Sequence, residues 1–438
     1  MSTIDLQAVK GTRDFYPDDM RLRTWLFGLW REVAAQYGFE EYDSCVLESE
    51  ELYIRKAGDE ITDQLYNFID KGGRRVALRP EITPSLARMV MAKGTSLPLP
   101  ARWFAIAQCF RYENMQRGRK REHFQWNMDV IGLGAEAAEA ELMAAQCAFL
   151  RATGLSLSAQ KCEIIIKVSN RQVIQHFLEG LGITGDAFAA VCVIIDKHDK
   201  IGRDATIHTL SGLGIGSEPA GRILEILAVT GLAEATAIVG ADNPGISSLT
   251  RLMSHLSDFG IAHCARIDLS VIRGLSYYTG CVWEVFDASG SLPRAIAGGG
   301  RYDRLIESFG GTPLAMVGFG FGDVVIAEIL SERGLIPASV LARGIDDVVY
   351  PMSAAEFPVA NQLARALRAQ GRKVAVDYSE RRFKHVVKRA EDDGAKRLLI
   401  LGVDEVKNRR VTVRQLGKER VENQVALSEL GVADPVSP

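Results

Sequence analysis

The chain has 438 residues, of which 47% are hydrophobic and 24% are charged, and its formal net charge is −3. These values are typical of a soluble globular protein with two or three domains, and they argue against a protein that coats nucleic acid indiscriminately. No apolar run reaches membrane-spanning length, the first residues do not resemble a signal or transit peptide, and the seven cysteines are scattered with no CxxC pair. We therefore expect a protein of the reducing cytoplasm, without a disulfide framework or a structural zinc site.

The first hundred residues predict one helix followed by short strands. Apolar residues recur at three- and four-residue steps over Asp18–Gln36, and Gly38 follows the end of this run, so we expect a helix there. Strands are expected over Glu40–Leu47 and, as a short pair, within Gln64–Arg79.

A basic hairpin is the most informative feature of the chain. Two strand-like runs, Trp103–Tyr112 and His123–Ile131, flank a turn rich in cations. Guanidinium groups held above polar side chains suit the binding of a polyphosphate beside a small polar molecule, whereas a solvated basic hairpin is the plainer alternative. The residues concerned are Arg111, Arg117, Arg119, Lys120 and Arg121, together with Glu113, Gln125 and Asp129.

The middle of the chain changes character twice. A helix over Ala135–Thr153 and a strand over Cys162–Val168 precede a segment rich in Ala, Leu and Ile, from Asn170 to Ser257, that predicts several short helices. We interpret this segment as an inserted helical module. Strands resume over Ala265–Leu269 and Val282–Phe286, and glycine-rich turns and a helix over Asp323–Glu332 follow.

After a linker-like stretch beyond Gly334, strands alternate with helices. This alternation predicts a small, mostly parallel or mixed α/β domain. The expected elements are strands Asp347–Pro351, Lys373–Asp377, Arg397–Leu401 and Arg410–Gln415, and helices Ala354–Gln370 and Arg381–Asp393.

Three further segments carry polar groups suited to a binding site. In LRPEITPSLAR (78–88), Glu81 and Thr83 share a face if the segment is extended, but Thr83 and Pro84 also suit the start of a helix, which the segment alone favours. RGLSYYTG (273–280) is either part of a site or a surface turn with half-buried tyrosines. AGGGRYDRL (297–305) and VGFGFGD (317–323) lack the Rossmann spacing. The second of them also suits a strand that lets a flat ligand lie against its backbone.

In this order, the segments resemble histidyl-tRNA synthetase, a class II aminoacyl-tRNA synthetase, from about Val9 to Leu427. RGLSYYTG and AGGGRYD resemble the two histidine-specific signatures, FRYENMQRGRKREHFQ the class II hairpin motif, and VGFGFG the glycine-rich strand of the class. The sequences of two of these motifs, RKREHFQWNMDVIG and GFGFGD, are similar to those of the branch that includes plant organellar forms.

The resemblance implies a fold and a reaction. The fold would be an α+β class II catalytic domain over residues 1–335, an antiparallel sheet flanked by helices with a helical insertion at 170–257, and an α/β anticodon-binding domain over 344–430. The enzyme would be a homodimer that joins L-histidine to ATP, releasing pyrophosphate, and then transfers histidine to the 3′ adenosine of tRNA(His). Mg²⁺ would bridge the phosphates, and no protein-bound metal is expected.

The resemblance also assigns residues. Arg273 and Arg111 would be catalytic, and Arg111, Glu113 and Arg119 would bind ATP. Histidine would be bound by Glu81, Thr83 and Gln125 at its amino group and by Asp129, Tyr277 and Tyr278 at its imidazole. Gln116 in the hairpin and Arg381, Arg382 and Lys384 near the C-terminal end would contact tRNA.

The sequence departs from the family's usual pattern at several positions. Val324 and Val325 stand where the glycine-rich strand usually continues to Glu-Arg, and that arginine packs on adenine and reaches the γ-phosphate; Lys120 or Arg121 is a candidate replacement. Cys45 stands where the first class II motif usually closes with proline, and Ser276 where the second signature often has aspartate.

Two other functions fit the same segments. One is a catalytically silent paralogue that serves as the regulatory subunit of ATP phosphoribosyltransferase; such subunits lack the C-terminal domain and lose histidine-signature residues, both of which this chain keeps. The other is a sensor of uncharged tRNA, which would normally lie in a chain with a kinase domain, and the sequence has no kinase glycine loop or HRD segment.

Overall fold

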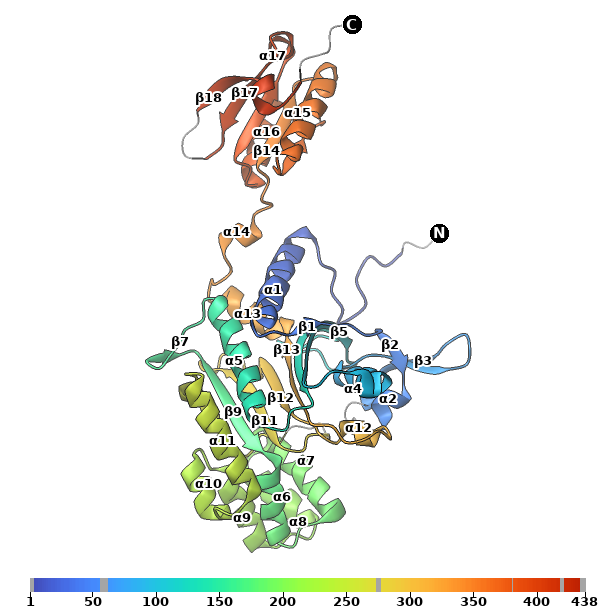
Figure 1. Cartoon of the computed structure of the whole chain (residues 1–438), viewed down its shortest axis with the longest axis vertical. Helices are drawn as coiled ribbons and strands as arrows, with labels where there is room; N and C mark the ends of the chain where they lie inside the picture. Colours follow the sequence, from blue (N-terminus) through green and yellow to red (C-terminus); the bar gives the residue numbers. More distant parts are fainter. Residues whose placement is uncertain (1–3, 56–61, 273–276, 380, 418–420, 434–438) are drawn as a thin grey trace. The chain divides into compact units, whose positions relative to one another are not determined.

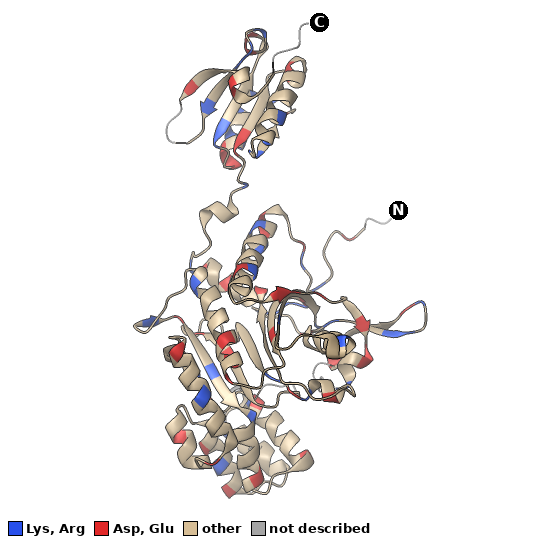
Figure 2. Cartoon of the chain, viewed as in Figure 1, with Lys and Arg blue, Asp and Glu red and all other residues tan. Residues whose placement is uncertain are grey.

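The computed structural model describes residues 4–433 except 56–61, 273–276, 380 and 418–420. The chain divides into two compact units, Met1–Leu335 and Ile336–Pro438 (Figure 1). Charged residues of both signs are spread through each unit, in keeping with the small net charge (Figure 2). Among the described residues, no helix is both long enough and apolar enough to cross a membrane.

The first unit is built on a sheet of eight strands in the described residues, in the order β1-β5-β6-β13-β12-β11-β9-β10. The six central strands run antiparallel to their neighbours, whereas β1 and β10 lie parallel to β5 and β9 at the two edges. The strands are β1 (Glu40–Glu41), β5 (Ala101–Phe110), β6 (Glu122–Ile131), β9 (Ile164–Asn170), β10 (Ala265–Ile267), β11 (Cys281–Asp287), β12 (Ala297–Arg301) and β13 (Met316–Gly322).

One face of this sheet is covered by α1 (Pro17–Gln36) and α5 (Ala137–Ala152) (Figure 1). Trp30 of α1 stacks on Trp126 of β6 at 6.0 Å between ring centroids, and Trp126 meets Phe149 of α5 edge-on at 5.7 Å. Such aromatic contacts bury large apolar areas. They anchor both helices on the hairpin strands and leave the opposite face of the sheet to carry polar groups.

The opposite face is partly covered by α4 (Thr83–Lys93) and α12 (Leu305–Ser308). Leu86 and Val90 of α4 and Ile306 of α12 share a buried cluster with Val282 and Met316 of the sheet. The predicted helix start within LRPEITPSLAR is present, because α4 begins at Thr83 with Pro84 in its first turn.

Smaller elements complete the first unit. Six helices in the described residues occupy Arg171–Asp258, and a three-stranded sheet has the order β2-β4-β3. The elements are β2 (Leu47–Ser49), α2 (Glu51–Ile54), β3 (Tyr66–Ile69), β4 (Arg75–Leu78), η1 (Gly94–Ser96), β7 (Leu157–Ser158), β8 (Lys161–Cys162), α6 (Arg171–Gly180), α7 (Gly185–Ile201), α8 (Arg203–Gly212), α9 (Ser217–Leu227), α10 (Leu232–Val239), α11 (Pro244–Asp258), η2 (Ala262–Cys264) and α13 (Asp323–Glu332).

Two expectations for this unit were wrong. The single strand expected over Glu40–Leu47 is two strands in different sheets, β1 and β2. The glycines of AGGGRYD do not form a turn but the central strand β12, since they are paired on both sides with β11 and β13. Glycine runs carry no side-chain pattern, so only the pairing partners reveal such a strand.

The second unit is a five-stranded mixed sheet in the described residues, ordered β15-β14-β16-β17-β18. Buried Asp347 pairs with Arg397 at 2.6 Å, and Arg372 binds the same carboxylate, so its charge is neutralised. The elements are α14 (Ala338–Leu341), β14 (Asp347–Pro351), η3 (Ala354–Glu356), α15 (Phe357–Ala369), β15 (Val374–Val376), α16 (Phe383–Asp392), β16 (Arg397–Leu401), α17 (Val403–Lys407), β17 (Arg410–Gln415), β18 (Glu422–Ala426) and η4 (Leu427–Leu430). The strand–helix alternation was predicted, but α17 and β18 were not.

Candidate active site

Polar side chains alternate along β6 on the face that lies away from α1 and α5. Gln125, Asn127 and Asp129 are two residues apart and point to one side of the sheet. Their partners on the neighbouring strand β13 are Gly322, Gly320 and Gly318, in that order. Each polar residue of β6 therefore stands beside a glycine, which leaves room above the sheet.

The glycines are needed because the side chains around them take the space that a Cβ would occupy. A Cβ on Gly318 would lie 1.9 Å from Oδ1 of Asp129, and a Cβ on Gly300 would lie 2.6 Å from the ring of Tyr278. Both distances are too short for non-bonded atoms. The glycine-rich strands β12 and β13 thus form a floor against which these polar side chains lie.

A cavity opens above this floor. Tyr277 and Tyr278 are buried, and the Tyr277 hydroxyl donates a hydrogen bond to Oε2 of Glu81 at 2.9 Å. Segments more than 190 residues apart in the chain thus meet at one site. The residues that line the cavity are Glu81, Thr83, Gln125, Asn127, Tyr277, Tyr278, Gly298, Tyr302, Gly318, Phe319 and Gly320.

Asp129 is buried against Gly318 and Tyr302, two residues that line the cavity, although it is not itself part of the lining. The Tyr302 hydroxyl donates to its Oδ1, and its Oδ2 has no hydrogen-bond partner among the described residues. Burial raises the pKa of Asp129 to about 7, and the hydrogen bond from Tyr302 offsets only part of this effect. A buried carboxylate oxygen without a donor favours a ligand that brings an N–H group.

Asp129→Asn is expected to gain thermal stability relative to the wild type as the pH rises from about 5 to about 8. The pKa of Asp129 in the folded chain, about 7, lies above the value of about 4 in an unfolded chain. The stability that this group contributes is therefore full below about pH 4 and is lost as the pH rises through the folded pKa. Asparagine does not ionise, so the difference in Tm should grow across this range in thermal scans. A difference independent of pH would contradict the raised pKa.

The hairpin turn brings cations to the other end of the site. Arg111 is half-buried and donates from Nε to the carbonyl of Pro80 at 2.9 Å, and no described carboxylate pairs with it. Arg119 pairs with buried Glu113 at 2.5 Å, while Arg121 stacks over the Tyr112 ring at 3.8 Å. The anchored Nε leaves the remaining guanidinium nitrogens of Arg111 available to an anion.

Sequence reasoning missed His123, which lies on β6 beside this group. Burial and the positive charges of Arg111, Arg13 and Arg119 lower its pKa to about 3. The imidazole is therefore neutral at physiological pH and adds no charge to the cation cluster. The run of basic residues just before His123 in RKREHFQ was the available signal.

The family of the chain follows from comparison with known proteins. A model described as Histidyl-tRNA synthetase matches residues 11–322, and one described as Anticodon binding domain matches residues 347–431. The chain belongs to the histidyl-tRNA synthetase family. The histidine–tRNA ligase, chloroplastic/mitochondrial, of Arabidopsis thaliana is 46% identical over 98% of this chain and 86% of its own length. The histidine–tRNA ligase of Opitutus terrae is 42% identical over 94% of both chains.

Solved structures of this family share the fold. Histidyl-tRNA synthetase from Nostoc sp. superposes with a TM-score of 0.79 at 23% identity, covering 98% of this chain and 99% of that one. A Bacillus halodurans structure described as an ATP phosphoribosyltransferase regulatory subunit/histidyl-tRNA synthetase has a TM-score of 0.75 at 21% identity, covering 92% and 100%. The expected class II catalytic fold with a C-terminal anticodon-binding domain is thus confirmed.

Within the histidyl-tRNA synthetase signatures, the structure separates residues that face the site from those that support it. Tyr302 of AGGGRYD holds Asp129, whereas Arg301 points to the other face and pairs with buried Glu139 of α5 at 2.6 Å. Trp283 likewise donates to Gln146 of α5 at 2.9 Å. Tyr302 and Asn127 belong to the site although sequence reasoning did not select them; the two-residue spacing from Gln125 to Asp129 was the signal for Asn127.

Other residues that the family likeness selects lie away from the cavity or outside the described residues. Arg273 and Ser276 lie outside the described residues. Gln116 is exposed in the hairpin turn, and Arg381, Arg382 and Lys384 are exposed just before and within the first turn of α16 in the second unit. Val324 and Val325 are buried at the start of α13, and Cys45 is exposed.

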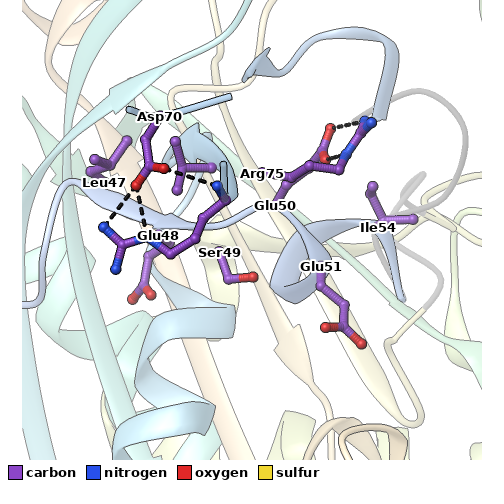
Figure 3. Close-up of a pocket in the computed structure, with 10 residues that line it drawn as sticks. Leu47, Glu48, Ser49, Glu50, Glu51, Ile54, Asp70 and Arg75 are labelled. Carbon is purple, nitrogen blue, oxygen red and sulfur yellow. Dashed lines mark hydrogen bonds and ion pairs between the residues drawn. The ribbon is translucent and has the colours of Figure 1, made fainter. Parts of the chain in front are cut away.

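A larger cavity lies away from this site, beside β2, β4 and α2 (Figure 3). The described arginines beside it are each paired with a carboxylate. Their charges are therefore neutralised, and they do not form a group of cations available to a phosphate. The pairs are Glu48–Arg88, Glu50–Arg75, Glu51–Arg55 and Asp70–Arg74. Size alone therefore does not identify the site of chemistry in this chain.

Proposed function

We propose that this chain activates L-histidine with ATP to give histidyl-adenylate and pyrophosphate, and then transfers the histidyl group to the 3′ adenosine of tRNA(His). One observation carries the proposal beyond family membership. The hairpin strands β5 and β6 lead from a buried pocket of acids and hydroxyls to Arg111, a half-buried cation with no described carboxylate partner. An amino acid and a nucleotide phosphate would meet between these two ends.

The polar pocket suits histidine. Glu81, Thr83 and Gln125 line the cavity and offer oxygen acceptors for an ammonium group. Asp129 and Tyr278, with Tyr277 beside them, offer fixed partners for the two imidazole nitrogens. A site whose buried polar groups must be paired rejects analogues that lack the matching atoms by about 10⁴–10⁵.

The cationic end suits ATP. In the activation step a histidine carboxylate oxygen bonds to the α-phosphorus and pyrophosphate leaves, so negative charge rises on the phosphate oxygens. Arg111 would hold the α-phosphate, Glu113 would lie near the adenine, and Arg119 would assist on the ATP side. Arg273, by family likeness, would stabilise the same developing charge.

Mg²⁺ would neutralise phosphate charge when it is bound. Glu113 is a carboxylate beside these cations, and Arg119 already pairs with it at 2.5 Å. We therefore propose that the ion is held mainly through the nucleotide.

The second unit would bind the tRNA. Its match to an anticodon-binding model supports this assignment, and exposed Arg381, Arg382 and Lys384 are our candidates for phosphate contacts. Gln116 in the hairpin would meet the acceptor end. Contacts of this kind make affinity for tRNA fall as salt rises. A cytoplasmic location stays a prediction.

We also propose a homodimer formed through the three-stranded sheet. Leu47, Ile54, Phe68 and Ile69 are large apolar residues exposed on β2, α2 and β3. Several large apolar residues exposed in one small sheet and its helix mark it as a candidate interaction site. Phe68 is 51% exposed, so replacing it should not disturb the core.

Phe68→Asp is expected to shift the protein from dimer to monomer in sedimentation velocity measurements, because it places a charge in the apolar interface. Phe259→Asp changes a residue of similar exposure, 45%, beyond the end of α11, and should leave the dimer intact. A wild-type protein that sediments as a monomer would contradict the proposed homodimer.

The reaction itself is tested by histidine-dependent ATP–pyrophosphate exchange with the purified full chain. A synthetase incorporates labelled pyrophosphate into ATP only when histidine is present. A regulatory subunit of ATP phosphoribosyltransferase would give no exchange, and that result would overturn the proposed function.

A further inference from the structure

Arg294 lies against the basic hairpin although it is far from it in the sequence. It belongs to the segment between β11 and β12, and its Nη2 donates a hydrogen bond to the Gln116 side chain. A Cβ built on Gly118 would lie 3.2 Å from Cδ of Arg294 and 3.4 Å from Cγ2 of Val325. Arg294 and Val325 thus reach the same point of the hairpin turn.

The charge around Arg294 is unbalanced. Partial burial and the positive charge of Arg119 both lower the pKa of Arg294, and only Glu113 acts in the opposite direction. Glu113 already pairs with Arg119 at 2.5 Å. Within the described ranges, Arg294 forms no ion pair of its own, so two guanidinium groups share a single carboxylate. An anion that binds between the two guanidinium groups would reduce the repulsion between them.

Neither cation favoured from the sequence occupies this position. Arg121 is held over the Tyr112 ring and donates to the carbonyl of Glu113 at 3.2 Å. Lys120 is exposed on the turn. Arg294, by contrast, reaches the same point of the hairpin turn as Val325, the position where the family's usual pattern has an arginine.

We propose that Arg294 binds the triphosphate of ATP together with Arg119, and that it supplies the cation that Val325 cannot provide. This inference rests on the proposed function, since it concerns the nucleotide of the same reaction. The small side chain of Val325 leaves the space into which Arg294 reaches from the β11–β12 connection. The positive charge is thereby kept at the site while its position in the sequence changes.

Arg294→Ala tests this role by steady-state exchange kinetics. We expect the KM for ATP to rise about 10- to 100-fold, because a charge-assisted contact is lost, while the KM for histidine stays within about twofold. Arg304→Ala is the matched control: Arg304 is exposed and contacts Glu307 at 3.9 Å. It should change neither constant.

Two further measurements separate a phosphate contact from a structural one. Equilibrium binding of ATP should weaken in Arg294→Ala while binding of adenosine stays the same, whereas a distorted site would weaken both. Adding Val325→Arg to Arg294→Ala should restore at least part of the affinity for ATP.

An unchanged KM for ATP, or equal weakening of ATP and adenosine binding, would overturn the role of Arg294. Those outcomes leave the proposed function standing, because the wild-type protein would still catalyse exchange. Absence of exchange in the wild type would instead remove the proposed function itself.

Discussion

Arg111→Ala is expected to lower the kcat of histidine-dependent ATP–pyrophosphate exchange about 100- to 1,000-fold. Arg111 is held by the carbonyl of Pro80 and has no described carboxylate partner, so its charge is available to the α-phosphate. The loss corresponds to about 3–4 kcal/mol of transition-state stabilisation. The fold should persist, since among the described residues the Arg111 side chain makes a single hydrogen bond, worth about 1 kcal/mol.

Arg117→Ala provides the control on the same hairpin. Arg117 is half exposed and pairs with Glu328 and Glu332 of α13. Its charge is therefore already neutralised, and exchange should change by less than about threefold. Equal losses in the two variants would show that general positive charge, rather than Arg111, supports the reaction.

Asp129→Ala is expected to raise the KM for histidine by about two orders of magnitude, while the KM for ATP changes only a few-fold. The selective loss of histidine binding corresponds to about 2–4 kcal/mol. Its Oδ2 lacks a donor among the described residues, and its Oδ1 accepts from Tyr302. Removing the carboxylate would leave the imidazole N–H and the Tyr302 hydroxyl without an acceptor, both of them buried. Exchange measured against histidine and against ATP separates the two constants.

Ser169→Ala is the corresponding control. Ser169 is a buried polar residue of β9 in the same sheet, and its strand partner is Val282, which does not line the cavity. Both constants should stay near their wild-type values in this variant. Equal increases in the KM for histidine and for ATP in Asp129→Ala would contradict the assignment of Asp129 to the imidazole.

The fold alone does not distinguish a synthetase from a regulatory paralogue, because solved structures described in both ways superpose on this chain. The distinction depends on the retained chemistry and on the closer relatives. Curated relatives 42–46% identical are named histidine–tRNA ligases, and the match to an anticodon-binding model extends over residues 347–431. These observations favour the ligase.

Local patterns in the sequence were sufficient for many of the elements. The periodicity of α1, the two hairpin strands, α13 and the alternation in the second unit are visible within windows of about 20 residues, because a helix or strand face repeats every 3.6 or two residues. The positions of Gln125 and Asp129 on one face of β6 follow from the same rule. Which polar groups share this face of β6 could therefore be predicted before any pairing was known, whereas their roles were assigned from the family resemblance.

Contacts between distant segments could be decided only by the tertiary structure. Tyr302 meets Asp129 across 173 residues and Tyr277 meets Glu81 across 196, and the register of β13 against β6 sets a glycine beside each polar residue. The same is true of Arg294, which reaches the hairpin across 178 residues. Strand register and the packing of connections depend on the whole buried core, so no short stretch of sequence contains them. The sequence by itself determined which groups this protein can offer to histidine and ATP, and folding decided which of them face one another.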